Sequence, residues 1–524
     1  MLPRLLAAAF ICSLLLFPAA ARPALGAGFT VGTTIDAPDS VPGDGVCAAA
    51  GGGCSLRAAV MEASALDGPD SISLPAGVYS LTLTGSGPLV INGGLAISGA
   101  GQYASVIDGS GVAAAGLGVF NIPYDPARPP VVFSGLTLRK GATPEYGGAV
   151  VARSALTLDH VKIERNTSAS GGGVYNSGIL SVFDSTISGN SAYLGGAIFN
   201  DIGGVLALER STIATNLAYT SGGGLQTYGA ATVTNSTVSG NSGGGLTGDQ
   251  GTISLLNSTV VHNIAPVGGA AGLAGAGFSI KNTIVAQNSG GPECAISGQS
   301  LGHNLDDDAS CPFGAAGDLS GESWLRLGPL ADNGGPTLTH ALLPSECAGS
   351  ACLPASAGID AGDNDGCPAS DQRGQPRPVD GDGDGIAQCD VGAYERCAAV
   401  PANYDCDGLP DASDNCPTVY NASQADANGD LKGDACEALG SGNVDCDGAI
   451  SSADALKLLR GVVRLAVYQS EPCADIGLML STGRRMGDVN CNGAISSADA
   501  LAVLRYAVLL PVGLPSGCPP IGPP

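Results

Sequence analysis

Apolar side chains recur at two fixed places in a unit of about 24 residues through the middle of the chain. One aliphatic residue lies three positions before the asparagine of the string Ser-Thr-Ile/Val-x-x-Asn, and another lies two positions after most glycine pairs. The steps between asparagines are 24, 26, 25, 22 and 25 residues, at Asn166, Asn190, Asn216, Asn241, Asn263 and Asn288. The glycine pairs drift in step with the asparagines, so both markers belong to one true period.

Between the two markers, apolar and polar residues alternate, as in Leu156-Thr-Leu158, Leu180-Ser-Val182 and Leu206-Ala-Leu208. Alternation is typical of β-strands, and Gly or Asn at the corners is typical of tight turns. Short strands with one lap per repeat predict an all-β fold, a parallel β-helix whose laps stack at about 4.8 Å. We expect aliphatic columns to fill the bore and the asparagines to form a ladder at one corner. The alternative, a leucine-rich repeat, would need a Leu-x-x-Leu-x-Leu frame, and no such frame recurs.

Composition agrees with a narrow bore and excludes several classes of protein. Gly and Pro number 81 and 33 among 524 residues without a Gly-X-Y period, which excludes collagen, and aromatic residues are 4%. The net charge is −25, so nucleic acids and anionic lipids would be repelled. The segment from Asp360 to Asp454 holds 20 of the 47 acidic residues and only 4 Lys and Arg. Such a block is either a solvated tail or a set of metal-ion loops.

The N-terminus predicts export. A positive Met-Leu-Pro-Arg start, an apolar run from Leu5 to Phe17 and Ala19-Ala20-Ala21 form a secretory signal, with cleavage after Ala21 or Ala27. No later stretch is long and apolar enough to span a membrane. Without Cys12, 16 cysteines remain, and in an exported chain they favour disulfides over zinc. As a hypothesis, they pair with their nearest neighbours: 47/54, 294/311, 347/352, 367/389, 397/406, 416/436, 446/473 and 491/518.

Motifs at both ends of the repeat resemble one group of secreted bacterial proteins. The string Cys54-Ser-Leu-Arg-Ala-Ala-Val60, followed by Glu62-Ala63, is similar to the "CSLREA" motif that opens many right-handed parallel β-helix proteins of the pectin-lyase-like type. The strings from Leu327 to His340, Asp371-Gln-Arg-Gly374 and Asp390-Val-Gly-Ala-Tyr-Glu395 resemble the "choice-of-anchor Q" module of the same group. The resemblance implies a right-handed coil with an N-terminal helical cap and a C-terminal closing module. The resemblance implies a role at a surface more than catalysis of a reaction.

β-Helices also include enzymes that act on polysaccharides, so catalytic groups need a test. Glycoside hydrolysis needs two carboxylates about 5–10 Å apart. The coil from Val131 to Gly290 carries only scattered acids, and the column His160, Asp184, Arg210, Asn235, Asn257, Asn282 indicates a surface corner ladder more than an acid with a basic partner. Asp306-Asp307-Asp308 forms an acidic loop between Cys294 and Cys311. The sequence therefore supplies no residue to which we assign a catalytic role, and enzyme activity stays uncertain.

Carboxylates recur around glycines in the segment 405–436. Their spacing suits Ca²⁺, which takes six to eight oxygen ligands, and together with Asn-Cys-Pro at 415–417 it resembles a thrombospondin type 3 repeat. Leu431 departs from the family, which usually has Gly there. The candidate ligands are Asp405, Asp407, Asp411, Asp414, Asp426, Asn428, Asp430 and Asp434. Asp380, Asp382 and Asp384 before Gly385 form the start of another such loop, though the spacing beyond them is poor.

Two segments that match each other 45 residues apart carry EF-type calcium loops. Each has oxygen ligands at positions 1, 3, 5, 9 and 12 and glycine at position 6, and each should be followed by a helix. The candidate ligands are Asn443, Asp445, Asp447, Ser451 and Asp454 in the first loop and Asp488, Asn490, Asn492, Ser496 and Asp499 in the second. A duplicated loop and helix near the C-terminus resembles a dockerin, which implies docking to a cohesin-type scaffold protein. The wide separation of the copies and the cysteine at loop position 4 depart from that family.

The sequence thus predicts a signal peptide (1–27), a β-helix with its cap (28–345) and a closing segment (346–396), followed by calcium modules. The calcium modules are a thrombospondin type 3-like repeat (397–440) and a dockerin-like domain (441–524). We expect a secreted, calcium-binding adhesion-type protein with a cohesin-type partner and a polysaccharide or cell-surface ligand. Alternatives are a polysaccharide hydrolase or lyase carried by its dockerin, and a passive stalk or surface-layer component.

Overall fold

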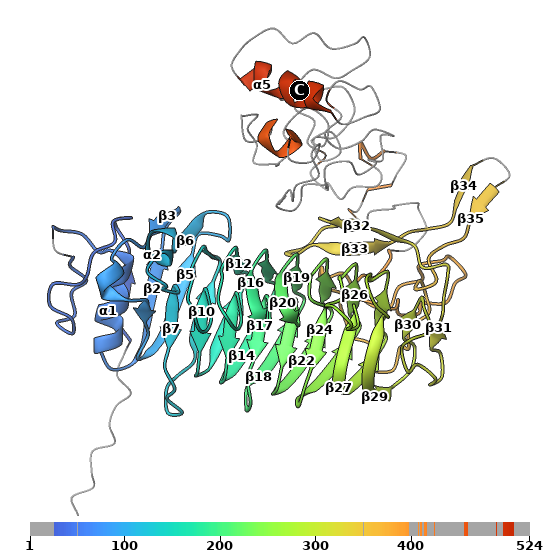
Figure 1. The fold of residues 1–524 in the computed structure, drawn as a ribbon, viewed down its shortest axis with the longest axis horizontal. Coiled ribbons are helices and arrows are strands. Elements are labelled where there is room, and N and C mark those ends of the chain that lie inside the picture. Colours follow the sequence, from blue (N-terminus) through green and yellow to red (C-terminus); the bar gives the residue numbers. More distant parts are fainter. Residues whose placement is uncertain are drawn as a thin grey trace, which may run out of the picture.

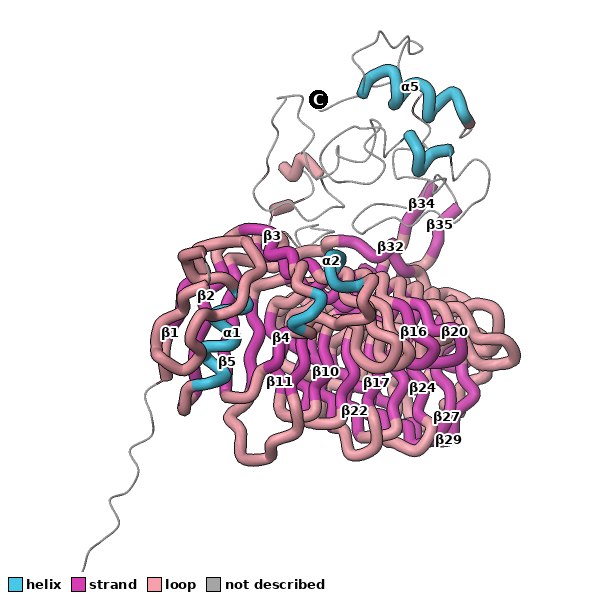
Figure 2. Tube along the Cα trace, turned by 60° about the vertical axis from the view of Figure 1, so that its left-hand side comes forward, coloured by secondary structure: helices cyan, strands magenta, loops and turns pink. Residues whose placement is uncertain are grey.

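The computed structural model describes residues 26–49, 51–348, 351–397, 407, 409–410, 413–416, 424, 455–459, 489 and 496–507. From residue 28 to residue 320 the chain winds through successive laps whose strands pair in parallel, so the predicted parallel β-helix is confirmed (Figure 1). Each lap runs along three strand faces, and the laps stack along one axis (Figure 2). Among the described residues, no helix is both long and apolar enough to cross a membrane.

The strands of the coil form three faces. Face one contains β1 (Gly28–Thr30), β2 (Pro69–Leu74), β5 (Gly94–Gly99), β8 (Val131–Ser134), β11 (Leu156–Asp159), β14 (Ile179–Phe183), β18 (Val205–Glu209), β22 (Ala230–Thr234), β25 (Thr252–Leu256), β27 (Leu273–Lys281) and β29 (Cys294–Ser300). Face two contains β4 (Leu89–Val90), β7 (Phe120–Ile122), β10 (Val150–Ala152), β13 (Val174–Asn176), β17 (Ile198–Asn200), β21 (Leu225–Thr227) and β24 (Leu246–Gly248). Face three contains β3 (Gly77–Ser80), β6 (Ser105–Asp108), β9 (Thr137–Arg139), β12 (Lys162–Glu164), β15 (Thr186–Ser188), β19 (Thr212–Ala214), β23 (Thr237–Ser239), β26 (Thr259–Val261), β28 (Ile284–Ala286), β30 (Leu305–Asp306) and β31 (Leu319–Ser320).

The register between laps is the one that the repeat predicts. On face two, Val150 pairs with Val174, Val174 with Ile198, and the column continues to Leu225 and Leu246. On face three, the aliphatic residues before each ladder asparagine pair in the same way, from Ile163 through Val285. These columns are fully buried and form one continuous core. A register slip of one residue would turn every one of these side chains outward, so burial of the columns fixes the register.

The asparagine ladder is confirmed; it is buried from Asn166 to Asn263, and its last member, Asn288, is half-buried. Asn216 is representative: its Oδ1 accepts from the backbone N–H (2.9 Å) and the Nδ2 (3.0 Å) of Asn190, one lap earlier. Its own Nδ2 donates to Ile187 O (2.9 Å), Ala214 O (3.0 Å) and Asn241 Oδ1 (2.9 Å). The ladder ends where Asn288 donates to the carboxylate of Glu293. Buried backbone groups at this corner are therefore satisfied by side chains rather than by water.

Left-handed backbone conformations turn the chain at the corners. The predicted polar column has positive φ at every position, from 53° at His160 and 46° at Asp184 to 50° at Asn282. In the glycine pair, the first residue is left-handed, as at Gly195 (φ 62°), and the second lies against the next lap. A Cβ on Gly196 would lie 2.5 Å from the carbonyl oxygen of Gly223, which explains why this position is glycine. Directly before this glycine pair, β16 (Ser191–Leu194) and β20 (Leu217–Ser221) form a short extra sheet.

A helical cap covers the N-terminal end of the coil, as the Cys-Ser-Leu-Arg motif implies. Helix α1 (Leu56–Ala65) begins at Ser55, whose side chain accepts from the Ala58 N–H at 3.0 Å, and it lies at the end of the coil (Figure 1). Arg57 is buried on Asp36 with a 2.6 Å contact between Nε and Oδ1. The buried Glu62 accepts from the backbone N–H groups of Gly43 and Gly45. A second short helix, α2 (Ser110–Ala113), and a 3₁₀ turn (Thr84–Ser86) lie in the first laps.

The closing segment folds back along the outside of face three. It contains the hairpins β32 (Leu327–Ala331) with β33 (Thr339–Leu342) and β34 (Glu346–Ala348) with β35 (Ala351–Leu353). Outward side chains of β19, β23 and β26 bind it: Thr212 donates to Leu338 O (2.7 Å), Thr237 to Gln372 Oε1 (2.6 Å), and Thr259 accepts from Ala393 N (3.0 Å). The segment that the sequence places at the end of the coil therefore covers one of its sides.

Three of the nearest-neighbour disulfides are confirmed, namely Cys47–Cys54, Cys294–Cys311 and Cys367–Cys389. Cys347 and Cys352 lie opposite each other in the β34–β35 hairpin. Cys397 and Cys416 are also disulfide-bonded, but their expected partners lie outside the described residues, as does every cysteine beyond residue 416. The predicted pairs 397/406, 416/436, 446/473 and 491/518 thus stay predictions.

Short helices occur where the EF-type loops should be followed by helices. Residues 455–459 are helical, and α5 (Ser497–Ala507) follows the second loop. Leu458 and Val503 are buried, whereas Leu456 and Leu501, which occupy equivalent positions 45 residues apart, are 57% and 55% exposed. The helices are amphipathic, and Leu456, Leu459, Leu501 and Leu504 lie on their exposed sides.

Candidate functional site

Most of the predicted calcium ligands lie outside the described residues. These are Asp405, Asp411, Asp426, Asn428, Asp430, Asp434, Asn443, Asp445, Asp447, Ser451, Asp454, Asp488, Asn490 and Asn492. In the first module, Gln424 Nε2 donates to both Asp407 (3.3 Å) and Asp414 (2.8 Å), so these two carboxylates are brought together. In the second loop, Ser496 and Asp499 form a reciprocal cap at the start of α5, with Ser496 N–H donating to Asp499 Oδ2 at 2.8 Å. Calcium ligation by these residues stays a prediction.

The loop of Asp380, Asp382 and Asp384 gains a fourth acid that the sequence pattern does not indicate. Asp360 lies against it, and its carboxylate accepts from the backbone N–H groups of Gly381 (3.3 Å) and Asp382 (2.7 Å). Oxygens of Asp360, Asp380 and Asp382 lie within 4.8 Å of one another. Burial raises the pKa of Asp360, and the negative charges of Asp382 and Asp380 raise it further, against the backbone hydrogen bonds. Hard oxygen ligands of this kind suit Ca²⁺.

The acidic triplet Asp306-Asp307-Asp308 has a structural role in the last lap. Asp306 is buried and accepts from the N–H groups of Cys311 (3.2 Å) and Gly321 (3.3 Å). Asp307 accepts from Gln287 N (3.0 Å), and Asp308 accepts from Glu293 N (3.0 Å). Each carboxylate therefore ties one loop of the coil to the next.

The polar column at the corner is partly an ion-pair ladder. Arg210 makes a bidentate pair with Asp184, with contacts of 2.9 and 2.8 Å, and its Nη1 lies 2.6 Å from Glu209. His160 bonds its neighbour Asp159 at 2.7 Å. Further along the column, Asn235, Asn257 and Asn282 donate to carbonyl oxygens of the closing segment, so these three side chains anchor that segment. The corner-ladder interpretation explains the column better than an acid with a basic partner.

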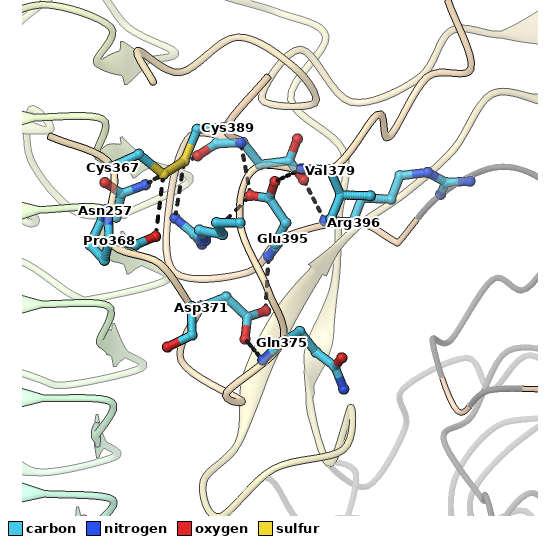
Figure 3. A network of polar contacts seen from close by, with 12 residues as sticks. Asn257, Cys367, Pro368, Asp371, Gln375, Val379, Cys389, Glu395 and Arg396 are labelled. Atoms are coloured by element: carbon cyan, nitrogen blue, oxygen red, sulfur yellow. Dashed lines mark hydrogen bonds and ion pairs between the residues drawn. A yellow bond between two sulfur atoms is a disulfide. The ribbon is translucent and has the colours of Figure 1, made fainter. Parts of the chain in front are cut away.

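A buried polar network holds the closing segment together (Figure 3). Asp371 accepts from the N–H of Glu395 (3.0 Å) and from Arg373 Nε (2.8 Å), and Glu395 accepts from the N–H of Asp390 (2.9 Å). Burial raises the pKa of Glu395 to about 7, against the attraction of Arg377, and burial together with Glu395 raises that of Asp390. Every member is enclosed, so the network shapes the segment and offers no surface to a substrate.

The richest chemistry on the outside of the coil lies on face two. We call it the tyrosine–aspartate strip, and it consists of Tyr146, Arg153, Tyr175, Phe199, Asp201, Gln226, Tyr228 and Asp249. Tyr175, Phe199 and Gln226 are the middle residues of consecutive strands β13, β17 and β21 and point outward from the bore. Arg153, Asp201, Tyr228 and Asp249 each directly follow a strand of the same face. The repeat therefore places seven of these residues in two neighbouring columns. The eighth, Tyr146, lies against the ring of Tyr175.

Aromatic rings in the strip contact one another from lap to lap. The ring centroids are 4.5 Å apart for Tyr146 and Tyr175, 5.7 Å for Tyr175 and Phe199, and 5.5 Å for Phe199 and Tyr228. The middle pair is stacked at an interplanar angle of 5°. Tyr175 and Phe199 are each 7% exposed, whereas Tyr146 is 40% exposed. The middle rings thus form a fixed base, and the end rings, the exposed Tyr146 and the half-buried Tyr228, are more accessible.

Hydrogen bonds organise the polar groups of the strip. The Tyr175 hydroxyl donates to Asp201, and Gln226 Nε2 donates to Asp249 Oδ2 at 2.7 Å, beside Tyr228. Burial and the adjacent aspartates raise the pKa of both tyrosines, so their hydroxyls stay protonated and donate. The carboxylates of Asp201 and Asp249 are the acceptors of these hydrogen bonds.

The sequence contains the signal for this strip, but the signal lies outside the two markers that define the repeat. The strip occupies the position directly after the aliphatic column, as in Val174-Tyr175 and Ile198-Phe199, and the position two further on. The signal is the recurrence of aromatic residues at one outward position, in a chain of which only 4% is aromatic.

Comparisons with known proteins give little beyond the fold. No family model matches the chain, and no curated protein matches it. Among solved structures, the crystal structure of pectate lyase Pel9A matches with a TM-score of 0.41 and 14% sequence identity, over 71% of this chain and 97% of that chain. A match at this level assigns no activity, so the functional argument has to come from the residues themselves.

Proposed function

We propose that this chain is a secreted surface protein whose coil binds an extracellular polysaccharide or cell-surface ligand while its C-terminal modules attach it to a partner. The observation that carries the proposal is the tyrosine–aspartate strip on face two. Ring surfaces combined with a few oriented polar groups are typical of ligand-binding surfaces. The closing segment binds face three and the corner beside it, so its described contacts do not involve the strip.

The alternative of a polysaccharide hydrolase is less well supported by the geometry of the strip. Asp201 and Asp249 follow β17 and β24, and β21 lies between these strands. Two lap spacings place their backbones about 10 Å apart. Retaining hydrolases hold their carboxyl groups at about 5–5.5 Å and inverting ones at about 6.5–9.5 Å. Both aspartates also already accept hydrogen bonds from neighbouring side chains. This arrangement suits binding better than acid–base catalysis.

For the C-terminus, we propose calcium-stabilised modules that dock onto a cohesin-type partner. The exposed leucines of the two helical segments support docking, because Leu456 and Leu459 match Leu501 and Leu504 at the 45-residue spacing of the duplication. Calcium supplies the charge that lets loops with little apolar core adopt one structure. The residues that would hold it are the two predicted EF-type sets and the acids of the segment 405–434.

The test uses the full-length mature protein and has two independent parts. Titration with Ca²⁺ by calorimetry, with and without a panel of cohesins, measures the C-terminal claim, and the variant Asp454→Ala/Asp499→Ala is its control. Sedimentation with insoluble polysaccharides and chromatography of soluble products measure binding and turnover by the coil. We expect calcium binding, cohesin capture and polysaccharide binding without turnover. Product release would establish the enzyme alternative, and loss of every binding signal would leave a passive stalk.

A further inference from the structure

We infer that the ligand of the tyrosine–aspartate strip is a polysaccharide strand without acidic groups, which lies along the axis of the coil across successive laps. The inference rests on the proposed function and narrows it to a ligand class and a direction. It excludes the uronic acid polymers on which many β-helix enzymes act.

The direction follows from the order of the rings. Tyr146, Tyr175, Phe199 and Tyr228 come from four consecutive turns of the chain and follow one another in contact. A ligand that uses both accessible ends, Tyr146 and Tyr228, has to extend over these laps. The middle rings are fixed by their neighbours, so binding orders few side chains and loses little conformational entropy. An elongated molecule fits this arrangement better than a compact one.

The ligand class follows from the charges. Among the described residues, Asp201 and Asp249 form no ion pair with a lysine or arginine; their side-chain hydrogen-bond partners are Tyr175 and Gln226. The cation of the strip, Arg153, is engaged by Asn121 Oδ1 at 3.2 Å and lies over the Tyr175 ring, 5.9 Å from its centroid. The strip therefore offers two carboxylates as acceptors, which suit the donating hydroxyl groups of sugars. Carboxylate or sulfate groups on the ligand would be repelled, and the net charge of −25 adds to the repulsion.

Binding measurements on the full-length protein test the inference. The probes are soluble uncharged polysaccharides (xyloglucan, mixed-linkage β-glucan and galactomannan), with polygalacturonate as the acidic probe. The variants are Asp249→Asn and Tyr146→Ala, both at exposed residues. Loss of a charge-assisted hydrogen bond or of a ring contact should weaken binding about tenfold. Matched controls are Asp125→Asn and Tyr219→Ala, which change an acid with a 43% exposed side chain and an exposed tyrosine, both outside the strip.

The outcomes separate this inference from the proposed function. Binding of at least one uncharged polymer, weakened by both strip variants and unchanged by both controls and by added salt, is the expected result. Tighter binding of polygalacturonate that the strip variants weaken would overturn the ligand class and leave the binding function intact. Uncharged binding that the strip variants do not alter would place the site elsewhere on the coil. Absence of binding to every polymer would overturn this inference and the polysaccharide-binding part of the proposed function.

Discussion

At the scale of single residues, the ladder asparagine stabilises the coil more than any side chain on its surface. Each ladder amide replaces backbone partners that a corner cannot supply, in surroundings from which water is excluded. Asn216 makes five such hydrogen bonds, two as acceptor and three as donor. Removing a buried partner costs more than the bond itself contributes, because the group left behind stays desolvated.

The first prediction concerns Asn216→Ala. The change leaves the Asn190 amide groups and the carbonyls of Ile187 and Ala214 without their partner, so we expect a loss of about 3–5 kcal/mol in the free energy of unfolding. Chemical denaturation followed by circular dichroism measures it. Ser254→Ala, at an exposed position of face one, is the control and should change the stability by less than about 0.5 kcal/mol. Equal effects of the two changes would contradict the role of the ladder.

The second prediction concerns Glu293, where the ladder ends. Burial raises the pKa of Glu293 from 4.5 to about 7, and the neighbouring Asp307 adds to this shift, against the hydrogen bonds from Asn288. The folded state therefore holds a proton that the unfolded state releases between these pH values. The contribution of this group to stability is fully present below about pH 4.5 and is lost as the pH rises through about 7.

Glu293→Gln cannot titrate, so the decrease in its stability between pH 5 and pH 8 should be smaller than that of the unmodified protein, by on the order of 2 kcal/mol. Burial lowers the pKa of His340 from 6.5 to about 4, so protonation of this histidine destabilises the fold as the pH falls below 6.5. Both proteins contain His340, so the difference between their stabilities removes this effect. Denaturation curves across this range measure the difference. The exposed Glu145→Gln should keep the original pH dependence, and an unchanged slope in Glu293→Gln would refute the assignment.

At the scale of elements, the closing segment and face three depend on one buried glutamine. Gln372 is fully buried; its Oε1 accepts from Thr237, and its Nε2 donates to Thr212 (3.0 Å), Thr337 (2.9 Å) and Leu338 O (3.0 Å). These contacts join two strands of the coil to two parts of the segment. The third prediction is that Gln372→Leu loosens the segment by about 2–4 kcal/mol, because several buried polar groups lose their partner.

Hydrogen exchange with mass spectrometry measures the loosening directly. Amides of the segment 363–396 should exchange faster in Gln372→Leu, while the laps before β15 keep their protection, because contacts in a solenoid act on near neighbours. Gln375→Leu, three residues away and with only its backbone N–H donating to the segment, is the matched control. Faster exchange throughout the coil in Gln372→Leu would show that the segment is part of the coil's own cooperative unit.

The element scale also shows what a sequence can reveal and what it cannot. The repeat predicts the register of Val174, Ile198 and Leu225 because one strand column repeats the same local pattern in every lap. The return of the segment 327–396 along face three is not predicted, because no periodic signal connects Gln372 to Thr212, 160 residues away. The corner asparagines 235, 257 and 282 look like members of a ladder, and only the folded chain shows that they hold another segment.

At the scale of the whole molecule, we expect two parts of the chain to gain their stability from different sources. The coil and its cap bury one continuous apolar core and satisfy their corners internally. The acidic modules beyond residue 397 carry carboxylates in a pattern that an ion would have to neutralise. A ligand that binds only the folded form of one part stabilises that part alone. Calcium dependence should therefore divide the molecule near residue 397.

The fourth prediction is a split response to calcium removal by a chelator. Exchange protection in peptides that cover 405–436 and 443–507 should fall by at least about tenfold, whereas peptides of the coil between β2 and β28 should not change. Asp454→Ala/Asp499→Ala in the presence of calcium should reproduce the chelator's effect in 443–507 and leave 405–436 protected. Magnesium in place of calcium is the control for ionic strength and charge. A coil that loses protection together with the modules would refute the division, and modules that ignore the chelator would refute calcium binding.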